Sequence, residues 1–94
     1  MRTLAEVVEQ ASRLLHLHRN STACPRLVEL AARLRSGDNN AIISAISEAT
    51  GGAGSLNDQT LCPATVDDQL REAIREIERL ARSVACERGV ALVR

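Results

Sequence analysis

The chain has 94 residues, of which twelve are basic and twelve acidic, so its formal net charge is zero, and it contains no aromatic residue. This length fits one domain, residues 1–94, with a modest aliphatic core. A neutral chain without rings to stack on bases is not expected to bind nucleic acid. Every basic residue is an arginine, which is typical of a protein from a GC-rich bacterium.

The start of the chain and the cysteines indicate a cytoplasmic protein. Glu6 and Glu9 fall inside what would be the apolar region of a signal peptide, and no apolar run approaches the length of a membrane span. Cys24, Cys62 and Cys86 are odd in number and lack the CxxC spacing, which fits reduced thiols better than a disulfide framework. We therefore expect a cytoplasmic protein that has no membrane partner.

The first predicted helix runs from about Leu4 to His18. Thr3 is followed three residues later by Glu6, which is the pattern of a capping box at a helix start. The side chains that then recur at helical spacing on one face are Leu4, Val7, Val8, Ala11, Leu14, Leu15 and His18.

The second predicted helix begins after Ser21 or Thr22, carries Pro25 in its first turn, and ends near Ser36 because Gly37 follows. Its apolar face consists of Leu27, Leu30, Ala31 and Leu34.

The third predicted helix is capped by Asp38 and ends at Gly51. It has a broad apolar face, formed by Ile42, Ile43, Ile46 and Ala49. A face of this width predicts contact with two neighbouring helices.

The fourth and longest predicted helix begins at a second capping box, formed by Thr65 and Asp68, and ends at Gly89. Its apolar stripe consists of Val66, Leu70, Ala73, Ile74, Ile77, Leu80, Ala81 and Val84.

Charged side chains cover the polar side of this fourth helix. Arg71, Arg75 and Arg79 form one flank and Glu72 and Glu76 another, and ion pairs are predicted from Asp67 to Arg71 and from Glu78 to Arg82. A solvated helix face is the favoured interpretation. The alternative is that the arginine row binds a carboxylate or phosphate surface, for which the planar guanidinium is suited.

The connections between these helices are short except between Gly51 and Ala64. Short connections favour antiparallel neighbours. The sequence therefore predicts an all-α fold, a compact four-helix bundle with a glycine-rich loop between helices three and four. That loop, GGAGSLND over residues 51–58, has no lysine and no preceding strand, so it is a weak candidate for a nucleotide-binding loop. We expect Gly51 and Gly52 to close the third helix in left-handed conformations, and the alternative is a recognition edge that presents Asp58.

The histidines and cysteines do not form a recognisable metal or catalytic pattern. His16 and His18 fall on different faces of one helix, and together with Cys24 they match no zinc-ligand spacing. Cys24 precedes Pro25, Cys86 lies late in a helix, and neither has an evident orienting group. We expect no metal, no cofactor and no enzymatic activity.

The zero net charge hides a segregation of charge along the chain. Between Ser36 and Leu70 there is no basic residue, and the acidic residues there are Asp38, Glu48, Asp58, Asp67 and Asp68. Such a segment can steer a basic partner by long-range attraction. The alternative interpretation is that these carboxylates favour helix starts and are neutralised within the fold.

Part of the chain resembles a family of small uncharacterised bacterial proteins. The resemblance covers DNNAIISAISEATGGAGSLND and the following QTLCPATVDDQLREAIREIERLA, about half of the chain, and its distinctive residues are Gly51, Gly52, Gly54, Ser55, Asn57 and Asp58. The small size and helical make-up are similar to those of immunity proteins that neutralise toxins in competition between bacteria. This resemblance implies a protein partner and supplies no activity to transfer.

These observations lead to one hypothesis and one alternative. The hypothesis is a non-enzymatic immunity protein that binds a basic toxin domain through Asp38, Glu48, Asp58, Asp67 and Asp68, with Ser55 and Asn57 in the glycine loop. The alternative is a self-associating structural or regulatory module, in which spare aliphatic surface on helices three and four forms a homodimer.

Overall fold

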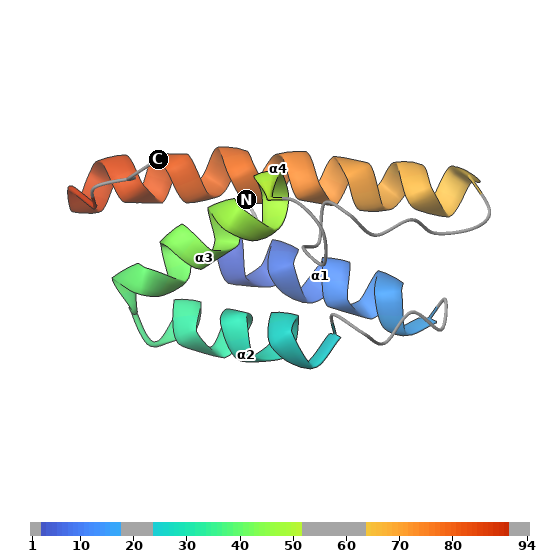
Figure 1. Cartoon of the computed structure of the whole chain (residues 1–94), viewed down its shortest axis with the longest axis horizontal. Helices are drawn as coiled ribbons and strands as arrows, with labels where there is room; N and C mark the ends of the chain where they lie inside the picture. The colour runs from blue at the N-terminus through green and yellow to red at the C-terminus, as the bar shows by residue number, and fades with distance from the viewer. Residues whose placement is uncertain (1–2, 18–23, 52–63, 91–94) are drawn as a thin grey trace.

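The computed structural model describes residues 3–17, 24–51 and 64–90, and these residues form four helices and no strand. The helices are α1 (Leu4–Leu17), α2 (Cys24–Arg35), α3 (Asn39–Thr50) and α4 (Ala64–Arg88). The predicted all-α four-helix arrangement is confirmed (Figure 1). The glycine-rich loop beyond Gly51 lies outside the described residues.

The helices form a closed ring in which each one packs against two others. α1 lies between α2 and α4, and α3 is inclined so that it contacts both α4 and α2 (Figure 1). The 25 residues of α4 correspond to about 37 Å of helix. Because the longest dimension of the molecule is 39 Å, α4 extends along nearly its whole length. Because α3 contacts both α4 and α2, the predicted contact of the third helix with two neighbours is confirmed.

The start of α1 and the end of α2 follow the predicted local chemistry. The Thr3 backbone N donates to Glu6 Oε1 at 3.0 Å, and the Glu6 backbone N donates to Thr3 Oγ1 at 3.3 Å, which confirms the capping box. After α2, Gly37 has a φ of 86°, a left-handed conformation that glycine adopts without steric cost.

The ends of α3 and α4 agree with the predictions in part. Asp38 caps α3 as predicted, since its Oδ1 accepts from the Asn40 backbone N at 2.9 Å. The prediction of a left-handed Gly51 is wrong: its φ of −75° and ψ of 178° are extended, and its N–H closes α3 by donating to the Ser47 carbonyl oxygen at 2.6 Å. Thr65 lies inside the first turn of α4 and is not its cap, because the helix already begins at Ala64. Gly89, with a φ of 66°, ends α4 as predicted.

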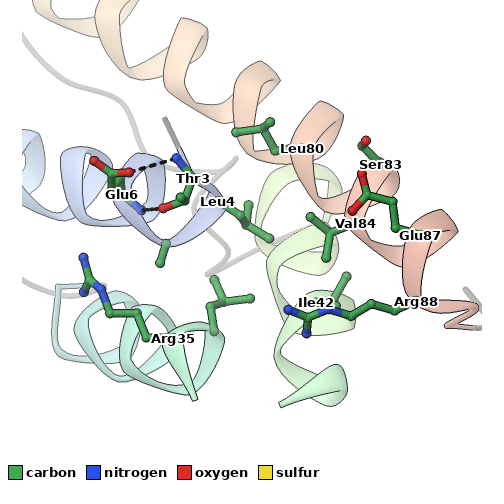
Figure 2. Close-up of a pocket in the computed structure, with 12 residues that line it drawn as sticks. Thr3, Leu4, Glu6, Arg35, Ile42, Leu80, Ser83, Val84, Glu87 and Arg88 are labelled. Atoms are coloured by element: carbon green, nitrogen blue, oxygen red, sulfur yellow. Dashed lines mark hydrogen bonds between the residues drawn. The ribbon is translucent and has the colours of Figure 1, made fainter. Parts of the chain in front are cut away.

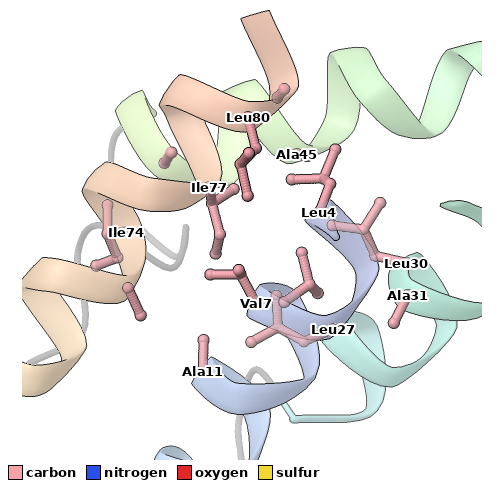
Figure 3. Packing of buried hydrophobic residues seen from close by; sticks show 14 of the residues in the cluster. Leu4, Val7, Ala11, Leu27, Leu30, Ala31, Ala45, Ile74, Ile77 and Leu80 are labelled. Atoms are coloured by element: carbon pink, nitrogen blue, oxygen red, sulfur yellow. The ribbon is translucent and has the colours of Figure 1, made fainter. Parts of the chain in front are cut away.

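Among the described residues, the core cluster consists of aliphatic side chains, which meet between the four helices (Figure 3). The largest fully buried ones are Leu15, Leu27, Ile42, Leu70, Ile77, Val7 and Val8. Ile43 was expected in this core and is instead 37% exposed, because the buried face of α3 is centred on Ala41, Ile42 and Ala45. Small alanines at such positions let neighbouring helices approach closely. Within the described ranges, no helix has both the length and the apolar character needed to cross a bilayer.

Candidate functional site

Glu48, one of the predicted acidic contacts, is buried against an arginine of the neighbouring helix. It lies on the inner side of α3 and is only 8% exposed. Arg26 on α2 donates from Nη2 to Glu48 Oε1 at 3.0 Å and from Nε to Oε2, so the pair is bidentate. Such a fork holds both side chains in one orientation. The negative charge of Glu48 is therefore balanced inside the fold and does not contribute to an open acidic surface.

Asp38, the second predicted contact, has two structural roles. Its Oδ1 caps α3, and its Oδ2 accepts from Arg33 Nε at 3.0 Å. The hydrogen bond from Arg33, followed by that from the Asn40 backbone, lowers the pKa of Asp38 below its ordinary value. Asp38 is thus an ionised carboxylate already held by donors from its own chain.

The two remaining described contact residues of the prediction, Asp67 and Asp68, lie near the start of α4. Asp67 Oδ1 lies 3.5 Å from Arg71 Nη2, which confirms the predicted ion pair. Asp68 is exposed and so is Glu72, one turn further along the same helix. Neither carboxylate has a hydrogen bond or ion pair within the part of the chain that the structure describes. Glu72 was predicted to lie on a polar flank but not as a contact residue, and its i,i+4 spacing from Asp68 was the signal that could have identified it.

The other three predicted contacts, Ser55, Asn57 and Asp58, lie outside the described residues. Among the four that are described, the structure thus separates three carboxylates with arginine partners, Asp38, Glu48 and Asp67, from the exposed Asp68. The alternative interpretation of neutralisation within the fold applies to these three.

The arginine row of α4 is broken up by ion pairs. Arg79 is bound to Glu76, and Arg82 Nη2 lies 3.0 Å from Glu78 Oε2, as predicted for the latter pair. With Arg71 also paired to Asp67, only Arg75 of the predicted row has no described partner. A solvated face whose charges neutralise one another describes this flank better than a continuous basic surface.

One end of the bundle contains a cavity of about 730 Å³ that sequence patterns did not reveal. All four helices contribute to it, and Figure 2 shows their side chains around a common space. Its aliphatic wall is formed by Leu4, Leu34, Ile42, Leu80 and Val84. This volume lies within the usual range of small-molecule sites, roughly 300–1,000 Å³.

Four charged side chains line this cavity, and two of them, Arg35 and Glu6, are engaged elsewhere. Arg35 forms a bidentate pair with Glu9, with Nη1 2.7 Å from Oε2, and this hydrogen bond lowers the pKa of Glu9. Glu6 is held by the capping box, and hydrogen bonds from the Thr3 backbone and side chain lower its pKa. Arg88 differs, because its only described contacts are with neutral oxygens, the Gly37 carbonyl and Asn39 Oδ1, each at 3.5 Å.

The histidines and cysteines that the structure describes do not come together. His16 and Cys86 are exposed on different helices. Over residues 3–17, 24–51 and 64–90, no group of three or more histidine, cysteine or acidic side chains has a geometry that could hold a metal ion. His18 and Cys62 lie outside these ranges, and of Cys24 only the backbone is described.

No protein-family model matches the chain, and neither a curated protein nor a solved structure is detectably similar to it. The arrangement of side chains offers two different kinds of binding surface. One is the exposed acidic pair formed by Asp68 and Glu72, and the other is the aliphatic cavity beside Arg88.

Proposed function

We propose that this chain is a non-enzymatic bacterial protein of the cytoplasm that binds another protein, namely an immunity protein that neutralises a toxin domain with a basic surface. The observation that carries the proposal is the acidic pair formed by Asp68 and Glu72 on α4. Both carboxylates are exposed and neither has a described partner of opposite charge.

The spacing of this pair supports a role outside the fold. Like charges four residues apart on a helix repel each other, and Arg71 and Arg75, three residues after Asp68 and Glu72, form no described ion pair with them, so the acidic pair contributes little to the stability of α4 itself. The helix macrodipole favours an acidic residue in the first turn, but its effect decreases beyond that turn, and Glu72 is the ninth residue of α4. A basic partner surface would supply the compensation that both carboxylates lack.

The position of the acidic pair also suits recognition. It lies on a helix anchored in the core by Leu70, Ala73 and Ile74, so the two carboxylates are presented by a rigid element. Ser55, Asn57 and Asp58 precede α4 in the sequence and remain part of the proposed contact surface. The proposed surface no longer includes the three carboxylates that have arginine partners within the fold, Asp38, Glu48 and Asp67.

The test is a binding measurement with the purified product of the neighbouring gene, at low and high salt. We expect association to be fast at low salt and to slow steeply as salt is added, because exposed charges are screened. The double variant Asp68→Arg, Glu72→Arg should lower the association rate by about tenfold or more.

A matched control is Glu29→Arg, which reverses an exposed carboxylate on α2 that also has no described partner. It changes the net charge in the same direction at a different place, and it should leave the association rate close to that of the unaltered chain. If the double variant and the control behave alike, or if the neighbouring product does not bind, the proposed contact surface is rejected.

A further inference from the structure

The aliphatic cavity at the end of the bundle is formed where the helices diverge. Leu4 from α1, Leu34 from α2, Ile42 from α3 and Val84 from α4 surround it, and Figure 2 shows Leu4, Ile42 and Val84 directed toward the same space. Leu34 and Val84 are only partly buried, so apolar surface is left available to a ligand. Covering such surface is favourable at about 25 cal/mol per Å².

Arg88 is the basic residue at this cavity that has no described acidic partner, since the other one, Arg35, is paired with Glu9. Elsewhere on α4, Arg71, Arg79 and Arg82 each have an acidic partner three or four residues earlier in the helix. At the corresponding positions before Arg88 the chain has Ala85 and Val84, which offer no carboxylate. The neighbouring Glu87 does not replace them, because adjacent residues point in different directions from a helix.

Arg88 lines the cavity together with Ile42 and Val84, and Figure 2 shows the Glu87 carboxylate directed toward Ser83. The contacts of Arg88 Nη1 with Gly37 and Asn39 are 3.5 Å long, at the outer limit of a hydrogen bond. An anionic ligand group could displace these weak contacts at little cost. A guanidinium can bind a carboxylate through two parallel hydrogen bonds.

We propose that this cavity is a binding site for an aliphatic carboxylate, whose hydrocarbon chain lies against the partly buried Leu34 and Val84 and whose carboxylate is bound by Arg88. The site is independent of the proposed partner surface. Arg88 is sixteen residues from Glu72 along α4, or about 24 Å along the helix axis. Failure of one proposal therefore leaves the other standing.

The test uses octanoate as the probe and the full-length chain, with calorimetry and methyl NMR spectra as readouts. The chain has no tryptophan or tyrosine for fluorescence, but the methyl groups of Leu4, Ile42 and Val84 report directly on the cavity. We expect saturable binding of octanoate that shifts these methyl signals. Octanol, which has the same chain and no charge, should bind about tenfold more weakly.

Two variants separate the role of Arg88 from a general effect of charge. Arg88→Gln should weaken octanoate binding about tenfold and bring it close to that of octanol. Arg75→Gln removes an exposed arginine without a described partner from the same helix, away from the cavity, and should leave binding unchanged. Circular dichroism establishes that both variants are folded. Equal binding of octanoate and octanol, an unaffected Arg88→Gln variant, or methyl shifts outside the cavity would each overturn the proposal.

Discussion

Acidic side chains have arginine partners at the seam between α2 and α3, whereas two acidic side chains at the exposed start of α4 have no described partner. At the seam, Glu48 and Asp38 on the α3 side are each bound by an arginine of α2. Among the four neighbouring helix pairs of the ring, this seam is the least extensive, and it contains a cavity of about 190 Å³ beside Arg26 and Glu48. At the start of α4, Asp67 is paired with Arg71 of the same helix, while Asp68 and Glu72 remain exposed and unpaired among the described residues. Paired carboxylates therefore join α2 to α3 where apolar contact is sparse, whereas Asp68 and Glu72 have no described partner within the fold.

The largest expected effect comes from breaking the seam. Glu48→Gln removes the charge from a carboxylate with a 10% exposed side chain and leaves Arg26 with a neutral partner. We expect the free energy of unfolding to fall by about 2 kcal/mol, the range measured for hydrogen bonds to charged groups. Urea unfolding followed by circular dichroism measures it. The matched substitution Glu72→Gln, at an exposed glutamate, should show no such loss, and an equal loss in the two variants would contradict the comparison.

A smaller loss of stability is expected at acidic pH, because protonation acts on paired carboxylates that are more exposed than Glu48. Hydrogen bonds lower the pKa values of Glu6, Glu9 and Asp38 from ordinary values of 4.5 for glutamate and 3.8 for aspartate. A lowered pKa in the folded state means that the unfolded chain takes up protons first as the pH falls. Their stabilisation is therefore fully present above the ordinary values and is lost as the pH falls through the lower values of the folded chain.

The measurement for this acid effect is urea unfolding over a pH series from neutral to strongly acidic. The unfolding midpoint should be constant near neutral pH and should fall below pH 4.5, the ordinary pKa of glutamate. Glu9→Gln removes the carboxylate that binds Arg35 and should make this fall shallower. A stability that is unchanged in acid, or an unaltered slope in the variant, would show that these hydrogen bonds do not contribute to folding.

The features that could be predicted from the sequence are those that local patterns determine. The capping box of Thr3 and Glu6, the Asp38 cap and the i,i+4 pairs depend on residues within one turn of each other. The pairing of Arg26 with Glu48 joins residues 22 positions apart and depends on how α2 meets α3, which no spacing rule contains. The same limit applies to the cavity, since its wall combines residues from four helices. The run of acidic residues along the sequence therefore predicted a single acidic surface. In the fold, some of these carboxylates are paired with arginines and others are not.

The smallest expected effect is that of Glu72→Gln on stability, and its sign distinguishes the two regions most sharply. Asp68, Glu72 and Glu76 follow one another at intervals of four residues, and Glu76 is bound to Arg79. Removing the middle charge relieves repulsion with Asp68 and Glu76 and gives up the attraction to Arg75, three residues on, so the free energy of unfolding should stay the same or rise by about 0.3 kcal/mol. Urea unfolding at low salt, where repulsion is least screened, is the appropriate measurement.

Asp68→Asn provides a comparison for this effect, because Asp68 has one acidic residue at four-residue spacing, Glu72, whereas Glu72 has two. Its removal should give a smaller gain than Glu72→Gln. If Glu72→Gln destabilises the chain as Glu48→Gln does, then Glu72 stabilises the fold. The proposed difference between the start of α4 and the seam would then be wrong. If it stabilises the chain while Glu72→Arg slows partner association, the same carboxylate is unfavourable for folding and favourable for binding, as expected of a residue whose compensating charge belongs to another molecule.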